Sequence, residues 1–595
     1  MINRICAFTI LLSLTFPVLG QNKVVDISDL NYSGKIRLFP DVEGKVVVGK
    51  SLSQYISESK RDDITVFPGW PVTMAGTNES GGVYCHLDDD DQLEIIYPVG
   101  NRLYAFNTDG TAVDGWPQQL DYPTDGTAAY GDIDGDGEGE IVVTTHQIAS
   151  FAVGSVYAFE KDGTNVPGFP VSTEGGGIRT PALGDLNLDR ALEIIITVRN
   201  WPEGFVYVFK GDGTVYPNWP QRMDYVPASS AAVGDIDGDD IPEIVTESYY
   251  RLHAYKTDGT LMPGFPYLPG ENRVFSYSTP VLADIDGDGN REIICGDHSV
   301  SDGTGAVHIV RSNGMSLPDW PRLTASWIYA PPSVADINGD GLFDVVIGDQ
   351  SLSTSPANKI YAWTAMTADT LPGFPVTGVF GINCQIILAD IDGDQQIELI
   401  ADDNSSDGKY AGFNHDGSVI SGWPLEVDGS TFYINPFVTD INNDGIAAIS
   451  GGGYNQDESI INLYLWNTGM AFKTESSPLP TLQYNTRRNG VYGDTLMVGI
   501  PVIENFKAEN WSLAPNPASD HVFLYNSASN LNRKKQKEIC ISLYNSSGTL
   551  VLSHNYLSDN QIELKLSGIS PGIYYIKISG YSQEPEVQKL VIIRK

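Results

Sequence analysis

The sequence predicts an all-β protein: an eight-bladed, or alternatively seven-bladed, β-propeller followed by a small immunoglobulin-like β-sandwich. Three observations support this fold class. An acidic loop recurs eight times at intervals of 46–54 residues. The loops are followed by short alternating runs and, in several repeats, by a turn of the Asp-Gly-Thr type, and every loop except the last is followed by a mark of an aromatic residue and proline, usually preceded by glycine. Residues 511–595 lack the loop but keep short alternating strands and turn signals.

The N-terminus has the pattern of a secretory signal peptide over residues 1–20. Arg4 precedes an apolar run over 5–14, and small residues at 18–20 form a cleavage site. The run is too short to span a bilayer, and no later segment is apolar for long enough either. We therefore expect an exported chain without a membrane-spanning segment, in which residues 21–60 form an N-terminal extension.

The formal net charge is −39 and it is unevenly distributed. Residues 511–595 carry nine basic and six acidic side chains, so this part has a net charge of +3 and the remainder −42. Such an acidic body repels polyanions. The charge argues against nucleic acid or an anionic membrane as a partner.

Residues 132–140 show the recurrent loop most completely. Carboxylates occupy loop positions 1, 3, 5 and 9, and Gly137 occupies position 6, where a sharp turn is needed. Carboxylates that converge in a tight loop require a hard cation, Ca²⁺ first. An EF-hand would need an acidic residue at position 12, which is Val143 here, and the flanks read as strands. The pattern predicts a calcium loop within a β-hairpin.

The eight loops differ in their candidate ligands. The first begins with His86, a poor calcium ligand, and the last has Ala448 at position 9, so we expect weak or no binding there. Arg190 replaces the glycine of the third loop, which predicts weaker affinity. The predicted metal ligands are Asp132, Asp134, Asp136 and Glu140; Asp185, Asn187, Asp189 and Glu193; Asp235, Asp237, Asp239 and Glu243; Asp284, Asp286, Asp288 and Glu292; Asp336, Asn338, Asp340 and Asp344; and Asp390, Asp392, Asp394 and Glu398. Sites spread around a ring cannot converge on one substrate, so we expect a structural role.

The period of about 50 residues accommodates four short strands, which is typical of a propeller blade. We expect the propeller to span residues 61–477. An extra aromatic/proline mark precedes the first loop, at 67–71, and no such mark follows the last loop. Because a propeller must close its ring, we infer that residues 64–72 supply the outer strand of the blade formed by about 432–467.

The Asp-x-Asp-x-Asp-Gly-x-x-Glu/Asp motif before a strand resembles the FG-GAP and VCBS repeats of integrin α-chain propellers and many exported bacterial proteins. This resemblance implies bound calcium and a partner on the face opposite the calcium loops. That face has aromatic and polar residues between the fourth strand of one repeat and the first of the next. They suit sugar rings or protein anchors, or alternatively pack between blades near the channel. The candidate partner-face residues are Tyr122, Arg179, Tyr225, Tyr277, Trp327, Tyr329 and Tyr433.

After a finishing segment and linker over 478–510, residues 511–595 resemble the type A C-terminal sorting domain of type IX secretion cargo. The resemblance is carried by Pro-Asn-Pro at 515–517, Leu-x-Gly-Ile-x-Pro-Gly-Ile-Tyr at 566–574 and the closing Lys-Leu-Val-Ile-Ile-Arg-Lys. It implies interaction with the type IX secretion machinery, passage across an outer membrane, and removal of the domain. The mature protein is then released or attached at the cell surface.

The sequence therefore favours a non-enzymatic, calcium-binding propeller, displayed at or released from a bacterial surface, that binds a glycan or protein. The repeats differ by only a few residues, which leaves little surplus loop for an active site. The sequence shows no nucleophile elbow, zinc motif or phosphate loop. Two alternatives stay open. Some eight-bladed calcium-bearing propellers are polysaccharide lyases, so this chain could be a polysaccharide-active enzyme, or it could be a purely structural surface-layer component.

Overall fold

The computed structural model describes residues 38–40, 46–48, 64–77, 80–88, 90–147, 152–275, 277–351, 357–404, 408–494, 511–514, 521–526, 538–545, 550–557, 561–566, 569, 572–579 and 586–592. The predicted signal peptide, most of the N-terminal extension and the linker after residue 494 lie outside these residues. The chain divides into two units, Met1–Lys50 and Ser51–Lys595. In the first, β1 (Leu38–Pro40) pairs antiparallel with β2 (Val46–Val48).

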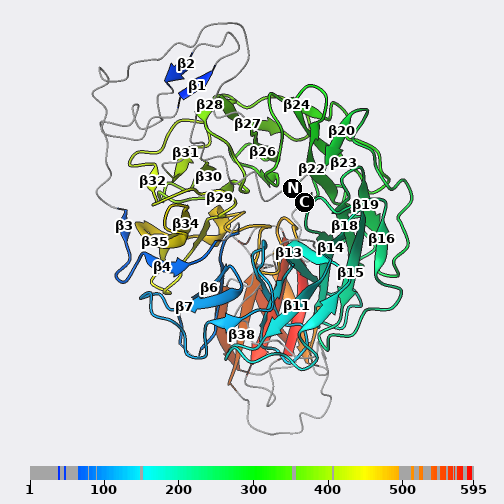
Figure 1. Cartoon of the computed structure of the whole chain (residues 1–595). Helices are drawn as coiled ribbons and strands as arrows, with labels where there is room; N and C mark the ends of the chain where they lie inside the picture. Colours follow the sequence, from blue (N-terminus) through cyan, green and yellow to red (C-terminus); the bar gives the residue numbers. More distant parts are fainter. Residues whose placement is uncertain are drawn as a thin grey trace, which may run out of the picture. The chain divides into compact units, whose positions relative to one another are not determined.

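The second unit contains a β-propeller of eight blades, numbered here in chain order (Figure 1). Each blade is an antiparallel sheet, and in all blades except five and eight its innermost strand comes first in sequence. Blade one comprises β5 (Val83–Cys85), β6 (Glu94–Val99), β7 (Arg102–Phe106) and β8 (Gln118–Gln119). Blade two comprises β9 (Ala129–Gly131), β10 (Glu140–Thr144), β11 (Gly154–Phe159) and β12 (Val171–Thr173). Blade three comprises β13 (Gly176–Gly184), β14 (Glu193–Asn200), β15 (Glu203–Phe209) and β16 (Gln221–Met223). Blade four comprises β17 (Ala232–Gly234), β18 (Glu243–Glu247) and β19 (Leu252–Tyr255).

The next four blades repeat the pattern, with an additional strand in blade five. Blade five comprises β20 (Arg273–Phe275), β21 (Val281–Ala283), β22 (Glu292–Ser299), β23 (Gly305–Val310) and β24 (Arg322–Thr324). Blade six comprises β25 (Ser333–Ala335), β26 (Asp344–Gly348), β27 (Asn358–Thr364) and β28 (Val376–Val379). Blade seven comprises β29 (Ile387–Ala389), β30 (Glu398–Asp403), β31 (Lys409–Phe413) and β32 (Leu425–Glu426). Blade eight comprises β33 (Phe437–Thr439), β34 (Ile446–Asn455), β35 (Ile460–Ala471), β3 (Thr65–Val66) and β4 (Val72–Ala75), and η2 (Thr474–Ser476) follows as a 3-10 turn.

The ring closes through blade eight. Strand β4 pairs with β35, with Val72 opposite Leu463 and Ala75 opposite Ile460, and β3 pairs with β35 further along. The N-terminal strands thus complete a sheet whose other strands lie almost 400 residues later in the chain. This closure is the one that the sequence predicts, except that the pairing extends beyond residue 72 to Ala75.

The glycine/aromatic/proline mark joins each blade to the next. At the boundary between blades one and two, the indole N–H of Trp116 in blade one donates to the carbonyl of Lys161 in blade two at 3.1 Å. Gly115 has a left-handed backbone, with φ of 89°, and a Cβ there would lie 2.3 Å from the carbonyl oxygen of Asp162. Only glycine allows this approach without displacing the neighbouring turn. The same indole contact recurs at Trp70, Trp219 and Trp320.

The segment after the last blade lies at the centre of the ring and contacts the innermost strand of every blade. Its backbone carbonyls accept hydrogen bonds from inner-strand amides of six blades, and the side chains of Arg488 and Tyr484 reach the other two. The bonded pairs are Gly82–Arg488, Tyr130–Thr486, Leu183–Arg487, Val233–Asn489, Leu282–Gly490, Val334–Tyr484, Leu388–Leu479 and Val438–Pro480. The central channel is therefore filled by residues 479–491.

Arg488 is the buried centre of this segment, with only 1% of its surface exposed. Its guanidinium donates to the carbonyls of Leu482 at 2.7 Å and Gly82 at 3.0 Å, and to the hydroxyl of Thr481 at 2.8 Å. Burial lowers the pKa of Arg488 to about 10, which leaves it charged at neutral pH. A buried charge held by carbonyl dipoles fixes the segment in one position, because moving it would leave the charge unsolvated.

Residues 511–592 form two further sheets. Strands β36 (Trp511–Ala514), β37 (His521–Asn526) and β40 (Gln561–Lys565) make one, and β39 (Leu550–Leu557), β38 (Glu538–Asn545), β41 (Gly572–Ser579) and β42 (Glu586–Ile592) make the other. Side chains of both sheets share one buried apolar cluster that includes Leu524, Ile541 and Ile576. This is a β-sandwich, and its immunoglobulin-like character stays a prediction. No helix in the described part of the chain is long and apolar enough to cross a membrane.

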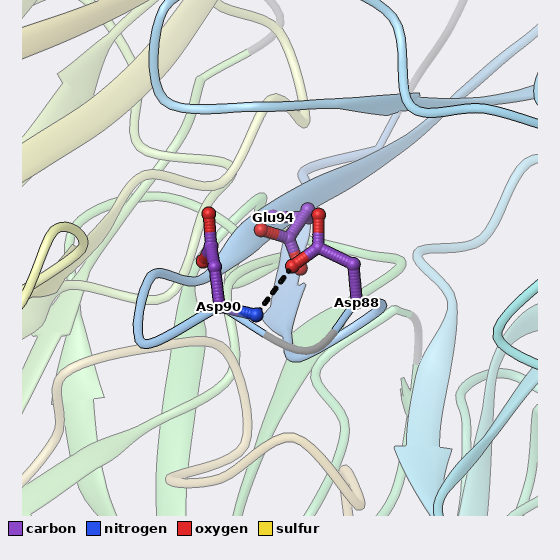
Figure 2. A group of neighbouring side chains, drawn as sticks. All are labelled: Asp88, Asp90 and Glu94. Carbon is purple, nitrogen blue, oxygen red and sulfur yellow. Dashed lines mark hydrogen bonds between the residues drawn. The ribbon is translucent and has the colours of Figure 1, made fainter.

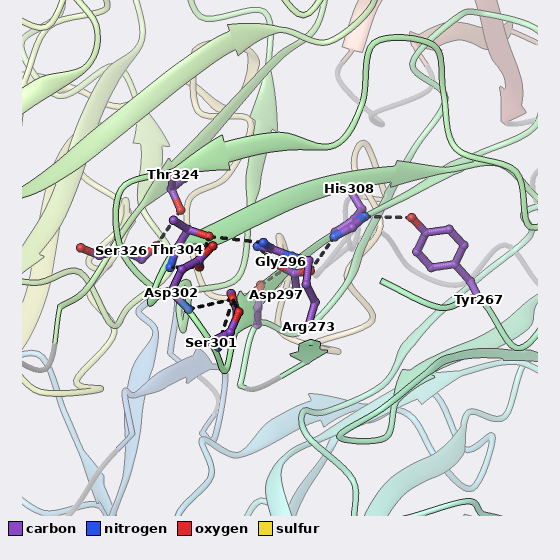
Figure 3. A network of polar contacts seen from close by, with 12 residues as sticks. Tyr267, Arg273, Gly296, Asp297, Ser301, Asp302, Thr304, His308, Thr324 and Ser326 are labelled. Atoms are coloured by element: carbon purple, nitrogen blue, oxygen red, sulfur yellow. Dashed lines mark hydrogen bonds and ion pairs between the residues drawn. The ribbon is translucent and has the colours of Figure 1, made fainter. Parts of the chain in front are cut away.

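Blade five has a buried polar network that explains its extra strand (Figure 3). Asp297 accepts two hydrogen bonds from Arg273 of β20, at 2.6 and 2.7 Å, and lies 2.9 Å from Nε2 of His308. The hydroxyl of Tyr267 lies 2.9 Å from the other ring nitrogen of His308. Burial alone raises the pKa of Asp297, but the hydrogen bonds from His308 and Arg273 outweigh it and hold the pKa below its usual value.

We predict that Asp297→Asn destabilises the propeller by about 3–5 kcal/mol at pH 7, because it leaves Arg273 buried without its counter-charge. A carboxyl with a depressed folded-state pKa contributes stability above its unfolded pKa of about 4, and this contribution is lost as the pH falls through the lower folded value. The melting temperature of the variant should therefore approach that of the parent below about pH 4. Calorimetry at pH 7 and pH 3 measures both.

Glu271→Gln is the matched control, because Glu271 lies two residues before Arg273 but is exposed. It should change the melting temperature little at either pH. Equal effects of the two substitutions at pH 7 would contradict a stabilising role for the buried pair.

Candidate functional site

Blade two shows how the acidic loop is built. It joins β9 to β10, and the carboxylate of Asp132 accepts hydrogen bonds from the backbone N–H groups of Gly135 at 2.6 Å and Gly137 at 3.0 Å. Asp134 accepts from the N–H of Asp136 at 3.1 Å. These bonds turn successive carboxylates toward one centre. One oxygen from each of these three aspartates lies within 4.8 Å of the others.

The acid at position 9 of this loop is a buried glutamate. Glu140 is fully buried, and its Oε2 accepts from the N–H of Ile133 at 2.8 Å. Its Oε1 has no hydrogen-bond partner. Burial, and to a lesser extent the charges of Asp134, Asp132 and Glu160, raise the pKa of Glu140 to about 8. A buried oxygen without a partner needs an explanation, and a cation at the loop centre supplies one.

Unpartnered buried oxygens recur in other loops. They are Oδ1 of Asp237 in blade four, Oδ1 of Asp286 in blade five and Oδ1 of Asp344 in blade six. Burial also raises the pKa of the position-9 acids to about 7 at Glu193, Glu243, Glu292 and Asp344, and to about 8 at Glu398. The donor sets consist of carboxylate and amide oxygens, which suit hard cations such as Ca²⁺.

The structure brings three acidic ligands together in five loops. Three groups consist of the predicted residues at positions 1, 3 and 5, in blades two, four and five, and a fourth consists of predicted residues of blade seven. The groups are Asp132, Asp134 and Asp136; Asp235, Asp237 and Asp239; Asp284, Asp286 and Asp288; Asp390, Asp392 and Glu398; and Asp88, Asp90 and Glu94. In blade seven Asp394 instead accepts hydrogen bonds from Gln396.

The fifth group, Asp88, Asp90 and Glu94 of blade one, is absent from the ligands proposed from the sequence (Figure 2). That loop begins with His86, whose imidazole is a poor calcium ligand, so the sequence-based prediction did not include its three acids. Glu94 is buried, and burial raises its pKa to about 7. The complete set of acids at positions 3, 5 and 9 is the signal that could have found it.

Loops with asparagine at position 3 behave differently. Asn187 donates to Glu193 at 3.0 Å in blade three, and Asn338 donates to Asp340 at 3.1 Å in blade six. In both, a neutral amide donor occupies the place that a cation would take beside the carboxylate. Among the described residues, neither Asp185 and Asp189 nor Asp336 and Asp344 belong to a convergent group of three acids.

The residue that follows the third strand of a blade adds a charge beside the loop. In blade two this residue is Glu160. In blade four Lys256 lies 3.7 Å from Asp237, and in blade five Arg311 lies 3.0 Å from Asp286. An internal cation offsets part of the loop charge, so these two loops should attract an external cation less strongly than that of blade two.

The opposite face contains a pocket at the mouth of the filled channel, to which every blade contributes. Leu482 and Gln483 of the central segment form its floor. The residues from the blades are Ser80, Asp125, Thr127, Arg179, Thr180, Ser230, Tyr277, Thr279, Pro331, Asn383, Tyr433 and Asn435. Except for Arg179 and Thr180, which lie at a register shift within β13, they come just before the innermost strands, where successive blades connect.

Arg179, Tyr277 and Tyr433 form a stacked group in this pocket. The guanidinium carbon of Arg179 lies 4.5 Å from the ring centre of Tyr277 and 4.3 Å from that of Tyr433. Each of the three residues has a left-handed backbone, with φ between 56° and 63°. This conformation costs about 1 kcal/mol or more in a residue with a side chain, and such residues cluster at functional sites.

Five of the seven proposed partner-face residues lie in one contact group. Tyr329 lies 5.5 Å from Tyr277 and 6.0 Å from Trp327, between ring centres. Tyr329 is buried and Trp327 half-buried, so part of this group also packs between blades, as the alternative interpretation expects. Tyr225 is linked to this group through Tyr249 and His298, and Tyr122 takes no part in the ring contacts found in the described part of the chain.

Comparison with known families identifies two parts of the chain. Residues 252–347 match the FG-GAP-like repeat, and residues 512–593 match the secretion system C-terminal sorting domain. The chain is thus a propeller with FG-GAP-like repeats and a type IX sorting domain. The sorting domain marks it for export by the type IX secretion system, to the cell surface or the medium. No curated protein matches the chain significantly.

Solved structures with similarity to the chain are propellers of several kinds. The V. cholerae biofilm matrix protein Bap1 is 13% identical, with a TM-score of 0.37 over 70% of this chain and 92% of that one. Quinohemoprotein alcohol dehydrogenase from Comamonas testosteroni is 10% identical, with a TM-score of 0.42 over 71% and 79%. The Pseudomonas aeruginosa PilY1 C-terminal domain is 11% identical, with a TM-score of 0.33 over 56% and 87%.

We predict that adding Ca²⁺ to the chelated protein raises its melting temperature. A cation that binds the folded loop and not the unfolded chain stabilises by about 2.7 kcal/mol per site at a concentration 100 times Kd. Glu140→Gln should reduce this gain, because it removes the buried charge at the blade-two loop. Glu174→Gln, an exposed change of the same kind on the link between blades two and three, should leave it intact. A melting temperature that does not respond to Ca²⁺ would overturn the metal assignment.

Removing the positive charge of Arg311 should strengthen calcium binding by the acidic loop of blade five. Arg311→Gln is expected to raise calcium affinity there by roughly fivefold, equivalent to about 1 kcal/mol of lost charge compensation. Isothermal titration calorimetry of the chelated protein measures it, with Arg322→Gln on the outer strand of the same blade as control. Weaker binding by Arg311→Gln would show that Arg311 supports the loop geometry instead of offsetting its charge.

Proposed function

We propose that this protein is an exported, calcium-stabilised, non-enzymatic propeller that binds a glycan or protein partner at the channel mouth. It is displayed at or released from a bacterial cell surface. Cations bind to the acidic loops on one face of the propeller and stabilise it, and the partner binds on the opposite face. The sorting domain supports export, and the convergent loops with unpartnered oxygens support cation binding.

The observation that carries the proposal is the pocket around Arg179, Tyr277 and Tyr433. Residues from three blades distant in sequence meet there in left-handed backbone conformations. The aromatic faces and the guanidinium offer apolar stacking next to polar groups, which is the combination found in recognition sites. The neighbouring wall residues Asn383 and Asn435 add both hydrogen-bond donors and acceptors.

The geometry favours binding over catalysis. His308, a buried histidine in blade five, contacts the buried carboxylate of Asp297, which also pairs with the largely buried Arg273, so its imidazole is not exposed to a substrate. Among the residues that line the pocket, Asp125 is the single carboxylate, and it lies 2.8 Å from His146, whereas glycoside hydrolysis normally uses a pair of carboxylates. We therefore place the polysaccharide-active enzyme second.

An array of immobilised glycans, probed with the calcium-loaded mature protein, tests the proposal. We expect binding that Tyr433→Ala reduces at least tenfold, while Tyr122→Ala, on the same face but outside the ring contacts, retains it. Melting temperatures of both variants exclude unfolding. Cleavage of a bound glycan would favour the enzyme, and unchanged binding by Tyr433→Ala would remove the channel mouth as the site.

A further inference from the structure

A continuous series of ring contacts extends from the channel mouth across one side of the same face. It begins at Tyr433 and ends at Trp201, and it crosses blades eight, five, six, four and three. Successive ring centres lie 4.5–6.4 Å apart along Tyr433, Tyr277, Tyr329, Trp327, His298, Tyr249, Tyr250, Tyr225 and Trp201. We name this series the aromatic path.

The path lies on connections that share one face. In a blade, the link between the second and third strands and the link to the next blade both lie opposite the acidic loop. Trp201 belongs to the first kind of link, between β14 and β15, and Tyr277 to the second, before β21. Exposure varies along the path: Trp201 is 60%, Tyr250 45% and Tyr277 37% exposed, whereas His298 and Tyr329 are buried. Packing between blades does not require such exposure.

We propose that the aromatic path binds an extended, uncharged polysaccharide, with one sugar in the mouth pocket and the following sugars stacked along the path toward Trp201. This proposal rests on the proposed function and specifies its ligand. Sugar rings have apolar faces that stack on aromatic side chains, while their hydroxyl groups need hydrogen-bond partners at the edges. A long, narrow path suits a linear polymer better than a globular protein, which covers a broad patch.

Two polar groups along the path have no hydrogen-bond partner. Gln483, on the pocket floor, is 2% exposed, and neither its amide nitrogen nor its amide oxygen is bonded. The indole N–H of Trp327 is buried and also unpaired. Buried polar groups are normally satisfied, so these groups indicate a ligand that supplies both donors and acceptors. A sugar hydroxyl does both at once.

The charge around the path favours an uncharged polymer. The chain outside residues 511–595 has a net charge of −42, which repels a polyanion. The pocket also contains a carboxylate, Asp125, which lies 2.8 Å from His146. A carboxylate accepts hydrogen bonds from neutral hydroxyls but opposes a uronate or sulfate group. Arg179 supplies the complementary donors from the opposite wall.

The test uses the calcium-loaded mature protein and soluble polysaccharides in native affinity gels: neutral glucan, mannan, galactan and xylan, with polygalacturonate and alginate as acidic chains. We expect retardation by at least one neutral polymer and by neither acidic chain. Calorimetry with oligosaccharides of that polymer should show affinity rising at least tenfold from two to six sugars. Retardation by none of the neutral polymers, or preference for an acidic chain, would overturn the proposal.

Variants separate the path from the mouth. Trp201→Ala, an exposed position that does not threaten folding, should lower affinity for the six-sugar chain about tenfold and leave the two-sugar ligand unchanged. Met315→Ala, equally exposed but on the acidic-loop side of blade five, should change neither.

If Tyr433→Ala abolishes binding while Trp201→Ala binds long chains normally, the mouth is the site and the path is wrong. If Tyr433→Ala binds normally, the proposed function itself fails. Capture of a protein through the mouth with no glycan bound would likewise overturn the polysaccharide assignment.

Discussion

The buried arginine at the centre of the ring is the constraint on which the propeller depends. Arg488 holds residues 479–491 in a network of carbonyls, and that segment bonds to the inner strand of each blade. Blades pack only on their neighbours, so a ring of eight leaves inner-strand amides facing a central space. The segment satisfies many of them. Because the channel is filled, the metal and partner sites that we propose lie on the two outer faces.

The two faces of the propeller differ in the charged groups that they bring together. On one, carboxylates converge without enough internal cations, so the folded state has unsolvated negative charge that external cations relieve. Where Lys256 or Arg311 approaches a loop, the chain supplies part of that charge itself. On the other face, aromatic rings meet around Arg179 and few acids converge. The cation binding that we propose would therefore stabilise the scaffold that holds the proposed recognition face.

Local, periodic features could be predicted from the sequence. The spacing of the acids gave the loops, and the unpaired aromatic/proline mark at 67–71 gave the closure of blade eight. Features that depend on contacts between blades could not. Residues 479–491 do not belong to the repeat, so the periodicity of the sequence does not indicate their hydrogen bonds to the inner edges of the eight blades. Trp201 and Tyr250 lie on links of irregular length, and their approach to Tyr225 depends on how blades three and four pack.

The central claim is that cations and ligand occupy opposite faces of a ring with a filled channel. A crystal structure of the mature protein, grown with terbium ions and a neutral oligosaccharide, tests it most directly. We predict anomalous density in the loops of blades two, four and five, and sugar density over Gln483 and along the rings toward Trp201. Terbium at the channel mouth with none in the acidic loops, or sugar seated on those loops, would contradict the account.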